Sequence, residues 1–220
     1  MLKYDMPLYR PPSEGENLII QATLGCSFNL CCFCSMYRGK SYEARPLEAI
    51  LSEIDQAASW WPEARRVFLA DGDALALPTD HLLRILTHLA RSFPRLTRVS
   101  CYALPANLLK KTVAELTLLR KNRLTLIYYG IESGYAPLLK QIKKGASPSS
   151  MIEGLLKVAE AGMKVSATVI LGLAGRQQWQ AHIDGTVELL HQAPLSYLST
   201  LQLALFALVR LFMLPSMQHP

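Results

Sequence analysis

The sequence predicts an α/β fold built on parallel strands, and three observations support this prediction. Short apolar runs alternate with longer amphipathic stretches along the 220 residues. The runs are apolar at successive positions, as is typical of parallel strands buried on both faces. No repeat, low-complexity tract or linker interrupts the alternation, which indicates a single domain. Parallel strands joined by right-handed helical crossovers form a doubly wound sheet or a barrel, and both agree with this pattern.

Six strands are expected where short runs rich in β-branched, aromatic or leucine side chains occur. They span residues 18–23, 67–70, 96–102, 124–130, 165–171 and 198–206. Helices are expected where the apolar residues recur with helical spacing. They span residues 46–60, 79–92, 107–120, 137–143, 149–161 and 177–191. Pro46 suits a first helical turn, Thr79 is the expected N-cap of its helix, and Gly162 is the expected C-cap of another.

Composition and charge narrow the class of protein. Half of the residues are hydrophobic and 18% are charged, which excludes an intrinsically disordered chain. The net charge is +6, but the basic residues are spread along the chain, so a solvated basic surface is favoured over an anionic partner. The first residues carry charges and prolines where a secretory signal would be apolar, so a cytoplasmic protein is expected.

The segment 195–214 is nearly long and apolar enough to suggest a membrane span. Arg210 lies inside it, Pro194 precedes it, and its first half carries hydroxyl and amide side chains. We therefore expect a buried strand followed by a short tail, and no association with a membrane.

Four of the five cysteines lie between residues 26 and 34, which cannot serve as a distributed disulfide framework. Three thiolates in one loop can reach one metal centre and suit zinc or an iron-sulfur cluster. A closed zinc site needs four protein ligands, and no second Cys-x-x-Cys or close histidine pair supplies the fourth. Three ligands on a four-iron cluster leave one iron open to a small chelating substrate. A reduced loop of buried cysteines or a partial zinc site is the structural alternative.

The stretch 25–34, Gly-Cys-Ser-Phe-Asn-Leu-Cys-Cys-Phe-Cys, resembles the signature of the radical S-adenosylmethionine (SAM) superfamily. The resemblance implies that Cys26, Cys31 and Cys34 hold a 4Fe-4S cluster whose fourth iron is chelated by the amino and carboxylate groups of SAM. Phe33 matches the aromatic residue of that signature. The first gap has four residues instead of the usual three, as in some branches of the superfamily. Cys32 would not be a ligand, and a register that uses it is a minor alternative.

Two further elements resemble parts of the same superfamily. Asp71, Gly72 and Asp73 follow the second predicted strand, where a Gly-Gly-Glu-like element binds the SAM amino group; an ordinary Asp-Gly-Asp turn is the alternative. Glu132 and Ser133 belong to a Gly-x-Glu-Ser-Gly element.

With Lys144-Gly145, the Gly-x-Glu-Ser-Gly element resembles the branch of the Elongator catalytic subunit, methylthiotransferases and anaerobic coproporphyrinogen dehydrogenase. By this resemblance Glu132 accepts a hydrogen bond from a ribose or an amino group. Alternatively, Glu132 pairs with Lys143 or Lys144.

After the fifth strand, Leu171 and Gly172 are similar to an element that packs against the adenine of SAM, although any turn could need this glycine. Tyr102 and Pro105 look like a Tyr-Ala-x-Pro element of the branch. Tyr102 would either touch substrate or pack as a partly buried tyrosine.

Together these resemblances imply a partial (β/α)6 TIM-like barrel of parallel strands, with a core of about residues 19–199 and a divergent tail at 200–220. They imply a radical SAM enzyme that needs a 4Fe-4S cluster, SAM and an external electron donor of the flavodoxin or ferredoxin type. No side chain is assigned as an acid or a base, and the substrate is not readable.

Two rival interpretations are a metal- or cluster-binding module that recognises RNA without SAM chemistry, and a truncated, inactive relative. The sequence shows no RNA-binding motif and no dense basic patch.

Overall fold

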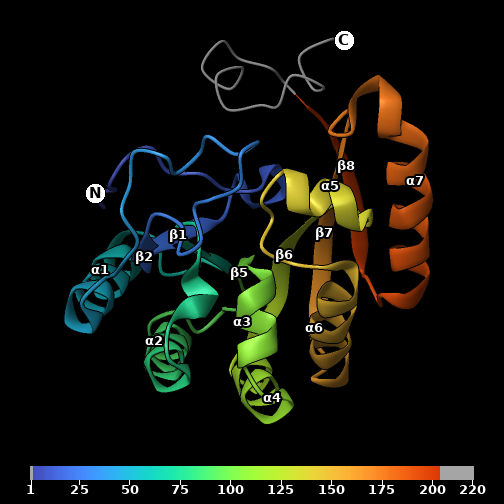
Figure 1. The fold of residues 1–220 in the computed structure, drawn as a ribbon. Helices are drawn as coiled ribbons and strands as arrows, with labels where there is room; N and C mark the ends of the chain where they lie inside the picture. Colours follow the sequence, from blue (N-terminus) through green and yellow to red (C-terminus); the bar gives the residue numbers. More distant parts are fainter. Residues whose placement is uncertain (1, 204–220) are drawn as a thin grey trace.

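The computed structural model describes residues 2–203, which form one parallel six-stranded sheet with helices packed against it (Figure 1). The strands follow one another across the sheet in chain order. They are β1 (Leu18–Gln21), β4 (Arg66–Ala70), β5 (Arg98–Ala103), β6 (Leu124–Glu132), β7 (Lys164–Leu171) and β8 (Tyr197–Gln202). Within residues 2–203, β1 and β8 form the two edges of the sheet. The arrangement is the partial TIM-like barrel that the sequence predicts.

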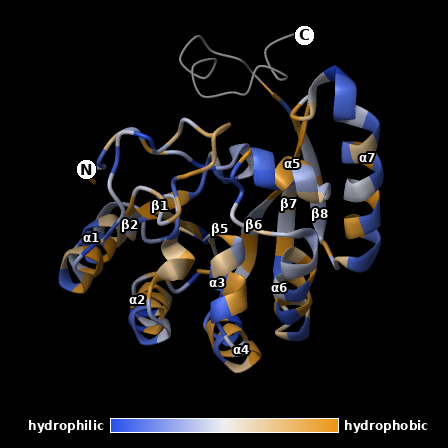
Figure 2. Cartoon of the chain, in the orientation of Figure 1, coloured by the Kyte–Doolittle hydropathy of each residue, from blue (hydrophilic) through white to orange (hydrophobic). Residues whose placement is uncertain are grey.

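Each crossover between neighbouring strands contains helical structure, as parallel pairing requires. The helices are α1 (Leu47–Trp60), α2 (Thr79–Ser92), α3 (Pro105–Lys110), α4 (Val113–Lys121), α5 (Ala136–Gln141), α6 (Pro148–Glu160) and α7 (Gly175–Gln192). Two single turns of 3-10 helix, η1 (Pro12–Glu14) and η2 (Ala74–Ala76), and a small antiparallel pair, β2 (Thr23–Leu24) and β3 (Glu43–Ala44), complete the elements. The helices turn apolar residues to the sheet and polar ones to solvent (Figure 2).

Alternate residues of β1, β4 and β6 enter two different clusters. Those facing the helices, such as Leu69 and Ile127, belong to the main core. Those on the other face, including Phe68 and Tyr128, form a smaller cluster that the N-terminal segment covers. The N-terminal segment also brings a buried carboxylate to this face.

That carboxylate is Glu14, which accepts hydrogen bonds from Arg98 (2.8 Å), Ser100 (2.9 Å) and Tyr128 (2.6 Å). The three donors stabilise a charge that would be costly to bury alone.

The predicted helix 107–120 is wrong as a single element, because it is two helices. Lys111 is extended (φ −75°, ψ 139°), and Thr112 begins α4 with a capping box in which Thr112 and Glu115 bond each other's main-chain N–H. The N-cap prediction for Thr79 is also wrong. Pro78 is the N-cap, and the Thr79 hydroxyl donates to Glu115 instead (2.7 Å).

The last strand is present, but the prediction that it is buried is wrong. All six residues of β8 are exposed, because β8 is a sheet edge. Residues 204–206 of the predicted strand and most of the predicted tail lie outside the described residues. None of the helices within residues 2–203 is long and apolar enough to cross a membrane.

Two other boundaries depend on positive φ angles. Gly162 (φ +72°) follows the C-cap of α6, so it ends that helix as predicted. β6 runs two residues beyond its predicted end, to Glu132, through a register shift between Gly130 and Glu132.

Candidate functional site

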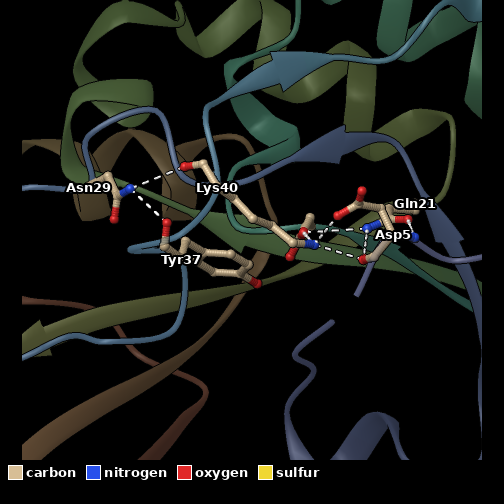
Figure 3. A network of polar contacts seen from close by, with 6 residues as sticks. Asp5, Gln21, Asn29, Tyr37 and Lys40 are labelled. Carbon is tan, nitrogen blue, oxygen red and sulfur yellow. Dashed lines mark hydrogen bonds and ion pairs between the residues drawn. The ribbon is translucent and has the colours of Figure 1, made fainter. Parts of the chain in front are cut away.

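The cysteine loop, residues 25–42, connects β2 to β3 at the carboxyl end of β1. Gly25 has φ +64°, and a Cβ there would lie 2.7 Å from the Ser41 carbonyl oxygen, so only glycine fits. The Asn29 side chain donates to the carbonyl groups of Tyr37 (2.8 Å) and Lys40 (3.4 Å) (Figure 3). These bonds hold the loop in place, although the loop has no regular secondary structure.

The guanidinium of Arg38 holds the part of the loop that carries the cysteines. It donates to the carbonyl oxygens of Cys31 (2.7 Å) and Cys34 (3.0 Å). The amide N–H of Cys34 also donates to the Cys31 carbonyl (3.2 Å). The spacing of these two cysteines is therefore set by local hydrogen bonds.

Cys26, Cys31 and Cys34 are half-buried thiols, and the pKa values of Cys26 and Cys31 are raised. Burial raises the pKa of Cys26, and Asp73 and Cys34 add to the rise. Burial raises the pKa of Cys31 to about 11, partly opposed by Lys144, while Cys34 and Cys26 raise it further. Cys34 therefore lies close enough to Cys26 and Cys31 to raise the pKa of each, and Cys26 lies close enough to Cys31 to do the same.

Cys32 has different surroundings. Its thiol donates to the Gln141 carbonyl at 3.8 Å, and its charged neighbours are Arg38 and Lys143. Its amide N–H donates to the Ile142 carbonyl (3.0 Å). Cys32 therefore attaches the loop to the end of α5, and its exclusion from the ligand set stays a prediction. Among residues 2–203, no three His, Cys, Asp or Glu side chains converge on a site for a single metal ion.

Asp73, which follows β4, is a buried carboxylate that is hydrogen-bonded to the cysteine loop. Its Oδ2 accepts from the hydroxyl of Ser27 and from the Asn107 amide (3.5 Å), whereas its buried Oδ1 has no hydrogen-bond partner among the described residues. Burial raises the pKa of Asp73 to about 6, and the two donors only partly oppose this. A cationic donor would satisfy the remaining oxygen, so the site suits the SAM ammonium.

Asp71 is tied to other groups. Its Oδ2 lies 3.3 Å from the Lys40 ammonium and 3.4 Å from the Gln21 amide, and Lys40 also pairs with Asp5 at 2.6 Å (Figure 3). Between the two aspartates, Gly72 has no room for a side chain, since a Cβ would lie 2.7 Å from the Tyr37 ring. The cysteine loop therefore rests directly on this turn.

Glu132 pairs with a lysine, which is the alternative that the sequence left open. Its Oε1 lies 2.9 Å from the Lys144 ammonium, and both side chains are buried. Burial acts to lower the pKa of Lys144, but Glu132 and Cys31 outweigh it and leave the pKa raised. Glu132 has φ +62°, an uncommon conformation for a residue with a side chain. Such conformations cluster at functional sites.

The Glu132–Lys144 pair is packed against the cysteine loop. The Lys144 ammonium lies 6.0 Å from the centre of the Phe33 ring. Gly145 (φ +73°) faces Phe28, whose ring would lie 2.3 Å from a Cβ at that position. The Lys-Gly element thus packs directly against the cysteine loop, although the two are more than 100 residues apart in the sequence.

Ser133 and Gly134 connect the end of β6 to α7. The buried Ser133 hydroxyl is hydrogen-bonded to His182 (2.8 Å), and the Gly134 amide donates to Thr186 (2.9 Å). A Cβ at Gly134 would lie 2.1 Å from the Gly185 carbonyl oxygen. The structure therefore gives this part of the Glu-Ser-Gly element a packing role, and a contact between Ser133 and a cofactor stays a prediction.

Leu171 and Gly172 lie at the carboxyl end of β7. Leu171 is 43% exposed and Gly172 has φ +81°. Their contact with an adenine stays a prediction. Tyr102 packs edge-to-face on Phe68, with ring centres 5.2 Å apart, so the packed alternative for Tyr102 is observed.

Sequence reasoning missed several polar residues at this site. Ser27 and Asn107 hold Asp73. Burial raises the pKa of Tyr42 to about 12, and Asp73 and Cys26 add to the rise, which places Tyr42 beside both. Lys40 neutralises Asp71. The only signal for Ser27 and Tyr42 was their position in the cysteine loop, since serine and tyrosine are common in any loop.

A comparison with protein families shows to which family the chain belongs. The model of the Radical SAM superfamily matches residues 20–189. The chain belongs to the Radical SAM superfamily. A curated relative from Methanocaldococcus jannaschii, named "Putative methylthiotransferase", is 22% identical over 183 residues, which are 77% of this chain and 39% of that protein. The chain thus spans well under half the length of this relative.

Solved structures share the fold. Coproporphyrinogen III oxidase (HemN) from Escherichia coli, described as a radical SAM enzyme, has a TM-score of 0.67 at 14% identity, over 89% of this chain and 46% of HemN. TsrM from Kitasatospora setae, a radical SAM methyltransferase with cobalamin and a [4Fe-4S] cluster bound, has a TM-score of 0.65 at 19% identity, over 86% and 37%.

The cobalamin-dependent radical enzyme OxsB, with SAM bound, has a TM-score of 0.68 at 16% identity, over 89% of this chain and 29% of OxsB. A 4Fe-4S cluster and SAM are the cofactors of the superfamily.

We predict that Gly134→Ala destabilises the fold by about 1–3 kcal/mol or more, because the new Cβ would overlap the Gly185 carbonyl. Urea unfolding measures the change. Gly39→Ala is the matched control, since a Cβ there meets nothing within 4 Å, and its effect should stay within about 0.5 kcal/mol. Equal effects of the two substitutions would contradict the close packing of α7.

We predict that the stability of the cluster-free chain falls as the pH rises from about 4 to about 6, because the folded state binds the Asp73 proton more tightly than the unfolded chain, where the pKa is near 3.8. Asp73→Asn should remove this part of the slope. Urea unfolding of both forms between pH 4 and 7 measures it, and identical slopes would show that Asp73 titrates normally.

We predict that Lys144→Met costs about 3–5 kcal/mol, because it leaves the Glu132 carboxylate buried without its cation. The double variant Glu132→Gln/Lys144→Met should recover most of that loss, since no charge is then left unpaired. Lys143→Met, at the exposed neighbouring lysine, is the control and should change little. Additive losses in the double variant would argue against the ion pair.

Proposed function

We propose that this chain is a radical SAM enzyme in which Cys26, Cys31 and Cys34 hold a 4Fe-4S cluster. The carrying observation is that Cys34 raises the pKa of both Cys26 and Cys31, and Cys26 also raises that of Cys31, while Cys32 bonds to the end of α5 instead. The loop sits at the carboxyl ends of parallel strands, where barrel enzymes place their active sites. Membership of the superfamily supports the same assignment.

A 4Fe-4S cluster held by Cys26, Cys31 and Cys34 and reduced by a flavodoxin- or ferredoxin-like donor would supply the electron for cleavage of SAM to methionine and a 5'-deoxyadenosyl radical that would act on the substrate. The protein's own residues would ligate the cluster, orient SAM and the substrate, and shield them from water and oxygen. Arg38 fixes the main chain at Cys31 and Cys34. The Lys144 ammonium lies 6.0 Å from the centre of the Phe33 ring, and it brings positive charge beside the thiol of Cys31.

Asp73 is the proposed partner of the SAM ammonium. Its Oδ1 is buried without a hydrogen-bond partner in the described chain, and Ser27 and Asn107 hold Oδ2 in place. An ammonium group would therefore gain a charge-assisted bond without breaking an existing one. Asp71 and Gly72 contribute by supporting the turn on which the loop rests.

Glu132 is the proposed acceptor for a ribose or amino group, oriented by its bond to Lys144. Ser133 positions the end of β6 through His182. Leu171 and Gly172 are the proposed contacts of the adenine at the end of β7. We place the enzyme in the cytoplasm, because a reducing compartment keeps the ligand thiols free.

The test is anaerobic reconstitution with iron and sulfide, followed by quantitation of both elements and of 5'-deoxyadenosine released with dithionite and SAM. Cys26→Ala, Cys31→Ala and Cys34→Ala should each lose most of the iron and all detectable 5'-deoxyadenosine, because three thiolates are the minimum that holds the cluster. Cys32→Ala is the matched control within the same loop and should keep its iron.

Two results would refute the proposal. Iron content that depends on Cys32 but not on Cys34 would mean that the ligand set is wrong. A protein that takes up zinc with all three thiols and releases no 5'-deoxyadenosine would support the metal-binding module instead.

A further inference from the structure

Basic side chains gather at the starts of the strands, the end of the sheet opposite to the cysteine loop. β4, β5, β6 and β7 are parallel neighbours, so the residues that come just before each strand lie at the same end of the sheet. In Figure 1 the C-terminal ends of α1, α2, α4 and α6 lie on this lower side. The basic residues there are Arg65, Arg66, Arg95, Arg98, Arg120, Lys121, Arg123 and Lys164.

Contacts between the connecting loops join these residues into one surface, the basic face. Arg66 and Arg98 are opposite each other in the β4–β5 register. The Arg65 carbonyl accepts from Thr97 (2.8 Å), and the Arg123 guanidinium donates to the Leu96 carbonyl (2.5 Å). The chain segments before β4, β5 and β6 are thus held side by side.

Most of this positive charge is not neutralised by the protein. Arg98 pairs with Glu14 at 2.8 Å. The other seven side chains of the face are exposed, and none has an ion pair within residues 2–203. Glu16, Glu63 and Glu160 are the exposed carboxylates at the same end. The basic groups therefore remain in clear excess.

Helix stability does not account for the whole face. Basic residues in the last turn of a helix interact favourably with its dipole, which explains Arg120 and Lys121 of α4. Arg65, Arg95 and Lys164 lie outside the helices, in loops or at the first position of a strand. They gain nothing comparable from a helix end, so the helix dipole does not explain their placement.

An exposed aromatic pair adjoins the basic face. Trp60 and Trp61, at the C-terminal end of α1, are stacked with ring centres 6.2 Å apart and planes 26° apart. Trp61 packs against the core, whereas Trp60 is 52% exposed. The loop that follows leads directly to Arg65 and Arg66. A large rigid ring beside cationic groups is the arrangement that stacks nucleic-acid bases.

We propose that the basic face binds single-stranded nucleic acid, with the exposed Arg and Lys side chains on the phosphates and Trp60 stacked on a base. An unpaired strand would use both the charges and the face of the indole ring, because its bases are free to stack. The face lies at the opposite end of the sheet from the cysteine loop, so this binding is independent of SAM chemistry.

The test is fluorescence anisotropy with a labelled single-stranded oligouridylate of about 12 nucleotides, as a function of salt from about 50 mM. Arg65→Glu/Lys121→Glu should weaken binding at least tenfold and reduce the salt slope by about 1.4, as expected for two lost phosphate contacts on a single strand. Lys140→Glu/Arg176→Glu is the matched control. It changes the net charge equally at exposed sites away from the face and should keep the wild-type slope.

Trp60→Ala tests the stacking separately. It should weaken binding about 5- to 100-fold without changing the salt slope, and Trp60→Tyr should retain most of the affinity. Circular dichroism melting verifies that each variant is folded. The proposal is overturned if the wild-type chain does not bind the oligouridylate, if both charge-reversed pairs weaken binding equally, or if a duplex of the same length competes better than the single strand.

Discussion

The close packing of the cysteine loop on the ends of the strands is the constraint on which the rest of the site depends. At Gly72 the loop comes so near that a single Cβ would overlap the Tyr37 ring, and at Gly145 the same is true of Phe28. Both glycines are needed because there is no space, and Gly145 is also needed for its positive φ. These contacts place the loop over both β4 and β6, so the cysteines, Asp73 and Glu132 share one site although they come from distant parts of the chain.

Two buried carboxylates at this site, Glu132 and Asp73, have partners of different charge. Glu132 has a full cationic partner in Lys144, so its charge is neutralised within the protein. Asp73 has only neutral donors, and one of its oxygens has none among the described residues, which is why burial raises its pKa to about 6. An unneutralised buried carboxylate is costly and becomes favourable only when a cation arrives. This difference between the two acids supports the proposal that Asp73 receives the ammonium and that Glu132 receives a neutral hydrogen-bond donor.

The parallel topology separates the two ends of the sheet. Every strand ends at the cysteine loop's side and begins at the basic face, so residues at equivalent places in successive strand-helix units gather at one end or the other. The carboxyl end collects the thiols, Asp73 and Glu132, and the other end collects exposed basic groups beside Trp60. One chain can therefore carry two sites that do not compete for space.

The sequence by itself determined the parallel α/β architecture, the position of the cysteine loop and the order of the elements that follow the strands, because these depend on residue periodicity and on short spacings. It did not determine which partner each polar side chain takes. That Glu132 pairs with Lys144, that Ser133 bonds to His182 and that the helix breaks before Thr112 are consequences of tertiary packing or of local competition that periodicity does not resolve. The basic face is the clearest case. No block of basic residues is visible in the chain, and only the pairing of strands brings Arg66 opposite Arg98, because the distance between residues in a sheet is set by register and not by separation in the sequence.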